Sequence, residues 1–283
     1  MDEKIALHMA ARRYCMEHIA HGDEWYKTDL RTLPPAGKDA IDRSILHSYL
    51  LPEIERVVPA DFATLDELRT FLISCSRTTE VPPPTQGRYP DQERTMDNER
   101  ERFRSYVTSL SPHDLHLVQP LPYRRLLTER EADRLWWRLE RRWGPRRDGF
   151  WYPLDGVTPP PQTVAFNDEW FALYVPPVLL RQILARRGVK RIWQLTTWGH
   201  QYEMDLALLF SSYRQTEGYW MADKWEWVLH QSHEQSLTVA GDRLLNPIKK
   251  AWPQWNEHLY TGWDYVRPSN EEIQRLTRGS TSS

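Results

Sequence analysis

The residues with the clearest chemical potential lie in one stretch, WEWVLHQSHEQSLTVAG, from Trp225 to Gly241. It places His230, His233 and Glu234 in the order H-x-x-H-E, and imidazoles and carboxylates are common zinc ligands. Three-residue spacing brings two side chains to one side of a helix, but on a strand it turns them to opposite faces. The order also differs from the H-E-x-x-H and H-x-x-E-H arrangements of zinc proteases. We therefore expect no metal site here and place His233 and Glu234 in a hairpin turn.

A second arrangement would use carboxylates from neighbouring strands. Glu203 and Asp205 share one face of a predicted strand, and Glu226 and His230 share one face of another. If these strands are adjacent, the paired carboxylates beside a histidine are suited to acid–base chemistry or to holding a divalent ion. The alternative is a solvated sheet face, which carries such residues without catalysing anything. Both interpretations stay open at the level of the sequence.

The first predicted helix, residues 3–21, carries an arginine and a histidine at a suggestive spacing. Arg12 or Arg13, followed by His18, resembles the R-x4-6-H motif of the HEPN ribonucleases. The resemblance implies that Arg12 and His18 act on RNA from one helix face. The resemblance covers seven residues. A HEPN-like nuclease is therefore an alternative hypothesis.

A stripe of arginines runs along one face of a helix predicted from Thr128 to Gly144. With Trp137 beside them, these side chains are suited to contacting phosphates and stacking a base, so nucleic-acid binding through residues 130–147 is one hypothesis. The alternative is a solvated helix whose arginines pair with its own acidic residues. The stripe consists of Arg130, Arg134, Arg138 and Arg141, and the acidic residues are Glu129, Asp133 and Glu140.

The start and the end of this helix are both marked in the sequence. Thr128-x-x-Glu131 predicts a capping box, and Gly144 is suited to a left-handed C-cap. The apolar residues recur on one side, which predicts packing against a sheet. They are Ala132, Leu135, Trp136, Leu139 and Trp143.

The following residues predict an antiparallel sheet. Short apolar or alternating runs are separated by turn residues at close spacing, which indicates a meander. Helices flank it at 177–187 and 243–252, so the fold class is α+β. The predicted strands are 150–152, 191–197, 202–209, 218–221, 225–231 and 236–240, and a short extended piece begins at residue 121.

Helical patterns dominate the first part of the chain. Thr64 to Glu67 forms a capping box for one of these helices. The stretch TTEVPPPTQGRYPDQERTMD combines four prolines with polar residues and predicts a linker. The expected organisation is a helical domain at 1–77, a linker at 78–97, connecting helices at 98–120, an α+β domain at 121–265 and a tail at 266–283.

Composition narrows the class of protein. The 283 residues carry a net charge of −2, which argues against bulk nucleic-acid binding. No run approaches the length of a membrane span, and the first residues lack the basic and apolar regions of a secretory signal. Two cysteines are too few for a disulfide framework. We expect a cytoplasmic protein that uses neither a cofactor nor a metal.

The tryptophan-rich second half resembles an uncharacterised bacterial family in the order of YRRLLTEREADRLWWRLERRWG, GFWYPLDG and EGYWMADKWEWVLHQSHEQSLTVAG. It is also similar to the intracellular immunity proteins of bacterial toxin systems, from which no functional residue carries over. Fourteen tryptophans exceed the usual need of a core, and Trp137, Trp198 and Trp220 stand in polar or turn contexts. We expect a non-enzymatic binding protein of an immunity or defence system that recognises a protein partner. The alternative is a metal-dependent or HEPN-like nuclease.

Overall fold

The computed structural model describes residues 1–26, 28, 32–82, 90–147, 151–154, 158–210, 217–262 and 267–279. By its internal contacts the chain divides into two compact units, Met1–Leu121 and Pro122–Ser283, which we call the helical unit and the sheet unit. The predicted α+β class, with a helical region before an antiparallel sheet, is confirmed. None of the described helices is both long and apolar enough to cross a membrane.

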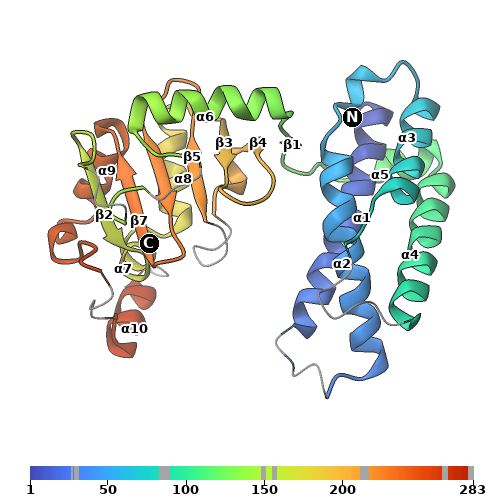
Figure 1. The fold of residues 1–283 in the computed structure, drawn as a ribbon, viewed down its shortest axis with the longest axis horizontal. Coiled ribbons are helices and arrows are strands. Elements are labelled where there is room, and N and C mark those ends of the chain that lie inside the picture. Colours follow the sequence, from blue (N-terminus) through green and yellow to red (C-terminus); the bar gives the residue numbers. More distant parts are fainter. Residues whose placement is uncertain are drawn as a thin grey trace. The chain divides into compact units, whose positions relative to one another are not determined.

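The helical unit is a set of helices packed around one apolar core (Figure 1). Its elements are α1 (Glu3–Trp25), α2 (Pro35–Glu55), η1 (Pro59–Asp61), α3 (Leu65–Thr78), α4 (Pro90–Ser109) and α5 (Pro112–Leu117). The helix α1 contacts α2, α3, α4 and α5. Leu7, Leu50, Leu72, Phe103 and Leu115, one from each α-helix in turn, are buried in the same cluster. The capping box predicted at Thr64 forms as expected.

The predicted linker at 78–97 is only partly a linker, because α4 begins at Pro90. A proline is accepted at the start of a helix, since its missing N–H would have no partner within the helix there. Gln92 is buried, and its Nε2 donates a hydrogen bond to Asp42 Oδ1 at 2.9 Å. This end of α4 is therefore held by a buried polar contact that the sequence pattern does not reveal. Residues 83–89 lie outside the described part of the chain.

The boundary of the first domain also differs from the expectation. The sequence places its end at residue 77 and treats 98–120 as connecting helices. In the structure α4 packs on α2 and α3, and α5 packs on α1, so both belong to the helical unit, which ends at Leu121. Their apolar residues complete the core of that unit.

Within the described residues, seven strands form one antiparallel sheet in the order β1-β4-β3-β5-β6-β7-β2. The strands are β1 (Arg124–Leu126), β2 (Thr163–Asn167), β3 (Arg191–Leu195), β4 (Tyr202–Asp205), β5 (Gly218–Met221), β6 (Val228–Gln231) and β7 (Ser236–Ala240). The meander is confirmed for β5, β6 and β7, which pair in sequence order. The earlier strands do not continue this meander, because β5 pairs with β3 and not with β4, which precedes it in the sequence. The strand β4 lies between β3 and β1.

The structure differs from the predicted strands at two places. The strand β2, which pairs with β7, is absent from the predicted set. Trp151 and Tyr152, predicted as strand, are not in one, and Phe150 lies outside the described residues. The Trp151 side chain is buried and its indole N–H donates to the Trp143 carbonyl at 3.0 Å. Trp151 is therefore a core residue that lies outside the strands.

Helices cover both faces of the sheet (Figure 1). One face carries α6 (Glu129–Trp143), and the other carries α7 (Asp168–Tyr174), α8 (Pro177–Ala185) and α9 (Asp242–Ala251). The strands β5, β6 and β7 are consequently buried at every position, as expected for a strand covered on both sides. The remaining elements are η2 (Leu206–Leu208), η3 (Trp255–Glu257) and α10 (Asn270–Gly279).

The helix α6 matches its prediction closely. Its capping box forms between Thr128 and Glu131, and Gly144 closes it in the left-handed conformation at φ 91°. Trp136 packs edge-on against Tyr219 of β5, with ring centroids 5.5 Å apart. All five residues of the predicted apolar stripe are buried: Ala132, Leu135, Trp136, Leu139 and Trp143.

Substituting the central residue of this stripe tests the packing of α6. Leu139 is fully buried, so Leu139→Ala should lower the free energy of unfolding by about 2 to 5 kcal/mol through lost contacts and a residual cavity. Arg138→Ala, on the exposed side of the same turn, should change it by less than about 0.5 kcal/mol. Denaturant unfolding measures both. Equal losses would mean that α6 does not pack through this face.

Candidate functional site

The strand order does not assemble the carboxylate patch proposed from the sequence. Glu203 and Asp205 lie on β4, whereas His230 lies on β6, and β3 and β5 run between them. At about 4.8 Å between neighbouring strands, the two sets are separated by roughly 14 Å. Glu226 lies before β6, and its Oε1 is 3.8 Å from Arg243 Nε. The sequence shows which residues share a strand face but does not give the order of strands.

His230 is a core residue. Its side chain is buried and stacks on Tyr219, with ring centroids 4.3 Å apart. Burial lowers the pKa of His230 to about 3, so the ring is neutral at physiological pH. His233 lies in the turn that follows, where its Nδ1 is 2.8 Å from Glu217 Oε2 and its Nε2 is 3.1 Å from Glu234 Oε1. The two histidines therefore have separate surroundings, as their placement on a strand and in a turn predicts.

Glu203 and Asp205 instead help to fix the edge strand β1. The Tyr123 backbone N–H donates to Asp205 Oδ2 at 2.7 Å. Arg125 lies directly opposite Glu203 in the β1–β4 register. The Leu127 N–H then donates to the Gln201 carbonyl at 2.8 Å, immediately before α6 starts. These contacts set the position from which α6 crosses the sheet.

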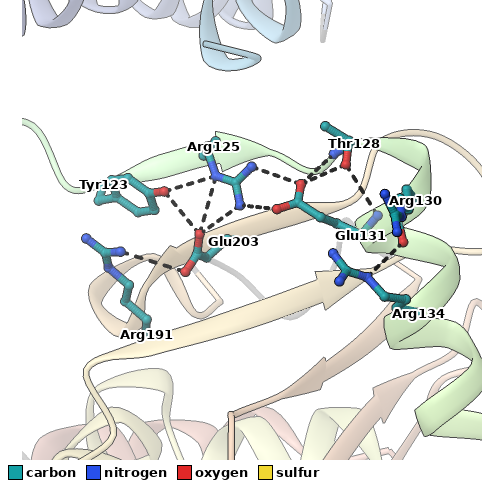
Figure 2. Close-up of polar contacts among 8 residues, drawn as sticks. All are labelled: Tyr123, Arg125, Thr128, Arg130, Glu131, Arg134, Arg191 and Glu203. Carbon is teal, nitrogen blue, oxygen red and sulfur yellow. Dashed lines mark hydrogen bonds and ion pairs between the residues drawn. The ribbon is translucent and has the colours of Figure 1, made fainter. Parts of the chain in front are cut away.

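Arg125 is bound by two carboxylates at this edge, as Figure 2 shows. Its two terminal nitrogens donate to the two oxygens of Glu131, each at 3.0 Å. Nη2 also donates to Glu203 Oε2 at 3.1 Å, and the Tyr123 hydroxyl donates to the same oxygen at 3.0 Å. The Arg191 guanidinium stacks over the Tyr123 ring at 3.8 Å, and its Nη1 is 3.7 Å from Glu203 Oε1. Glu131 and Glu203 are thus neutralised by neighbouring arginines.

Hydrogen bonds from two residues keep the Glu131 side chain ionised. Hydrogen bonds from Arg125, together with those from Thr128, outweigh the opposing effect of burial and lower the pKa of Glu131 to about 2. Glu131 is also the capping-box residue of α6, accepting from the Thr128 backbone N–H at 2.9 Å. One carboxylate therefore joins the start of α6 to the edge of the sheet.

A pocket of about 260 Å³ opens between this edge and α6. Trp193, Leu127 and Leu135 supply its apolar wall, while arginines and the two neutralised carboxylates supply the polar wall. Three arginines face two carboxylates, so the pocket favours an anionic group. Its lining consists of Arg125, Leu127, Glu131, Arg134, Leu135, Arg138, Trp193 and Glu203.

The arginine stripe of α6 continues from this pocket over the outside of the helix. Within the described residues, none of its four arginines lies within ion-pair distance of a carboxylate, so the predicted pairing along the helix does not form. Asp133 pairs instead with Arg147, at 2.6 Å, and Glu140 accepts from the Arg147 backbone N–H at 3.3 Å. A second, shallow hollow on this surface is lined by Glu129, Arg130, Asp133, Arg134, Trp137 and Arg138.

The three tryptophans predicted at the surface divide into two groups. Trp137 is 54% exposed with Arg141 stacked at 4.7 Å from its ring, and Trp198 is 86% exposed in the β3–β4 loop. Trp220 is only 2% exposed and belongs to the core beneath α7, α8 and α9. Its assignment to a binding surface is wrong, because both faces of β5 are covered and a polar sequence context does not reveal that.

The Arg12 and His18 pair is not joined in one site. Arg12 is buried and forms an ion pair inside the helical unit, with its Nη2 2.9 Å from Glu55 Oε1. His18 Nε2 is 3.0 Å from Glu99 Oε1, a buried carboxylate on α4. Burial alone would raise the pKa of Glu99, but hydrogen bonds from His18, from His47 on α2 and from Tyr14 hold that pKa well below its ordinary value. Glu99 and His47 lie on other helices, so residue spacing along α1 does not indicate them.

Comparison with protein-family models, with curated proteins and with solved structures finds no match for this chain. The resemblance to bacterial immunity proteins therefore stays a prediction.

The Arg125–Glu131 pair predicts a defined pH dependence of stability. Glu131→Gln keeps a side chain able to cap the helix but removes the charge, and should lower the free energy of unfolding at pH 7 by about 1 to 2 kcal/mol. Because the folded-state pKa lies below the ordinary 4.5, this contribution is fully present above pH 4.5 and is lost as the pH falls toward about 2.

Unfolding of wild type and variant at several pH values measures this difference. Glu129→Gln is the control, since Glu129 is exposed in the same helical turn and has no ion pair among the described residues. A difference between wild type and Glu131→Gln that stays constant from pH 7 to pH 2 would contradict the assigned role.

Proposed function

We propose that this chain is a binding protein that recognises an acidic segment of a protein partner through the exposed surface of α6. The observation that carries the proposal is the uncompensated arginine stripe, defined by Arg130, Arg134, Arg138 and Arg141. The carboxylates of Glu131 and Glu203 pair with Arg125, and Asp133 pairs with Arg147. Among the described residues no arginine of the stripe forms an ion pair with a carboxylate, which leaves the stripe available. An acidic partner would satisfy these charges.

Exposed aromatic side chains support a binding surface at the same place. Trp137 stands within the stripe and is preordered by its stacking on Arg141. Trp198 lies in a loop braced by Gln201, whose side chain bonds the Thr196 N–H at 2.6 Å and its carbonyl at 2.9 Å. That loop adjoins the start of α6 through the Leu127–Gln201 hydrogen bond. Tryptophan and arginine are the residue types most often found at the energetic centre of interfaces.

A protein partner fits this surface better than a nucleic-acid backbone does. Glu129, which has no ion pair among the described residues, lines the same hollow as the arginines and would repel a continuous run of phosphates. A protein segment can place its acidic groups selectively, opposite arginines and away from these carboxylates. The pocket beside Trp193 then offers a site for one anionic side chain with an apolar stem.

An enzymatic role on the sheet receives no support from the geometry. Glu203 and Asp205 are separated from His230 by two strands, and Glu203 is neutralised by Arg125. The bacterial immunity or defence setting and a cytoplasmic location stay part of the proposal, supported by the sequence resemblance and the composition.

The proposal is tested with the double variant Arg134→Ala with Arg138→Ala. The full tagged chain is used to isolate partners from the source cells, and a purified candidate is then titrated by calorimetry. We expect the double variant to weaken binding by at least about tenfold, and raised salt to weaken binding of the wild type. Trp137→Ala should have a similar effect.

Arg186→Ala is the matched control, since Arg186 is an exposed arginine at the end of α8, away from α6. It should bind as wild type does. A partner held equally by the double variant would overturn the proposal. Loss of the complex on nuclease treatment would replace it with nucleic-acid recognition.

A further inference from the structure

Three potential metal ligands converge inside the helical unit from helices that are distant in sequence. His18 comes from α1, His47 from α2 and Glu99 from α4. One ligand atom of each lies within 4.8 Å of the other two. His18 Nε2 is 3.0 Å and His47 Nε2 is 3.1 Å from the same oxygen, Glu99 Oε1. The packing of the three helices has therefore brought two imidazole nitrogens and a carboxylate to one point.

The burial of these groups makes their convergence unusual. The side chains of His47 and Glu99 are 0% and 1% exposed. Glu99 Oε2 and His47 Nδ1 are both buried and lack a hydrogen-bond partner among the described residues. A buried carboxylate carries a desolvation cost that cations offset, and Arg102 and Arg43 supply part of that charge beside Oε2, while both imidazole nitrogens converge on Oε1. Arg102 and Arg43 reach Oε2 only at 3.6 and 4.0 Å, which is beyond hydrogen-bond distance.

We propose that His18, His47 and Glu99 form a binding site for a divalent transition-metal ion, of which Zn²⁺ is the representative. Two histidines and a carboxylate are an established ligand set for zinc, with a further position left for water or substrate. Bonds of about 2.0 to 2.1 Å to a tetrahedral ion would separate neighbouring ligand atoms by roughly 3.3 Å. The two nitrogen–oxygen distances would lengthen slightly, and the ligand atoms of the two imidazoles, which lie within 4.8 Å of each other, would settle at about 3.3 Å.

The surroundings are suited to this role. The Tyr14 hydroxyl donates to Glu99 Oε1 at 2.8 Å and would orient the carboxylate from outside the ligand set. Arg43 and Arg102 approach the other oxygen, Oε2, so they need not occupy the position of the ion. His18 is 29% exposed, which gives the ion a route from solvent and leaves one side of the site open.

This site revises the expectation of a chain without metal. His47 lies 29 positions after His18, and Glu99 lies 52 positions after His47, so no short spacing in the sequence indicates that they meet. The proposal concerns the helical unit alone and is independent of partner binding by α6.

Metal binding is tested on the full chain after removal of metal with a chelator. Zn²⁺ is added at one equivalent, free ion is removed by dialysis, and bound zinc is measured by mass spectrometry. We expect one Zn²⁺ per chain and a rise in melting temperature, because the ion joins three helices. Co²⁺ in its place should give the visible absorption of a low-symmetry nitrogen and oxygen site.

His18→Ala should weaken zinc binding by at least about tenfold, and its partial exposure makes it the variant least prone to unfolding. His21→Ala is the matched control, an exposed histidine on the same helix. Glu99→Gln should also lose the ion, and circular dichroism shows whether it folds. If wild type retains no zinc, or His18→Ala retains as much as wild type and His21→Ala, the proposal is overturned.

Discussion

The ion pair between Arg125 and Glu131 is the interaction on which the α6 surface depends. It joins the first turn of α6 to the edge strand β1, and Glu203 completes the charge balance from β4. Because Arg125 and Arg191 engage these two carboxylates, neither carboxylate forms an ion pair with the arginines further along α6 in the described part of the chain. The availability of Arg134 and Arg138 for a partner is thus a consequence of how the sheet edge satisfies its own charges.

Local signals in the sequence predict α6 well. The capping box at Thr128, the glycine at 144 and the spacing of Leu135 and Leu139 each concern residues within one or two turns. The strands β5 to β7 are predicted equally well from local signals, since turn residues separate them at close intervals. What local patterns do not contain is the pairing of β5 with β3, and that pairing separates His230 from Glu203.

The absence of long-range contacts from local sequence patterns also explains the wrong predictions for Trp220 and for the Arg12 and His18 pair. Trp220 stands among polar neighbours in the sequence, yet helices cover both faces of its strand. Arg12 and His18 share a helix, yet one binds Glu55 and the other Glu99. In each case the decisive partner comes from a distant segment, and side-chain spacing along one element cannot identify it.

The two borders of the sheet are closed in different ways. Edge strands invite pairing with another chain, because one side of their backbone is not used by the sheet. At β2 a bridge from Phe166 to Leu259 extends the hydrogen bonding onto a following segment. At the other border β1 is only three residues long, and two of them are Arg124 and Arg125. Shortness and charge there discourage addition of a further strand, so that border protects the protein from aggregation while it fixes α6.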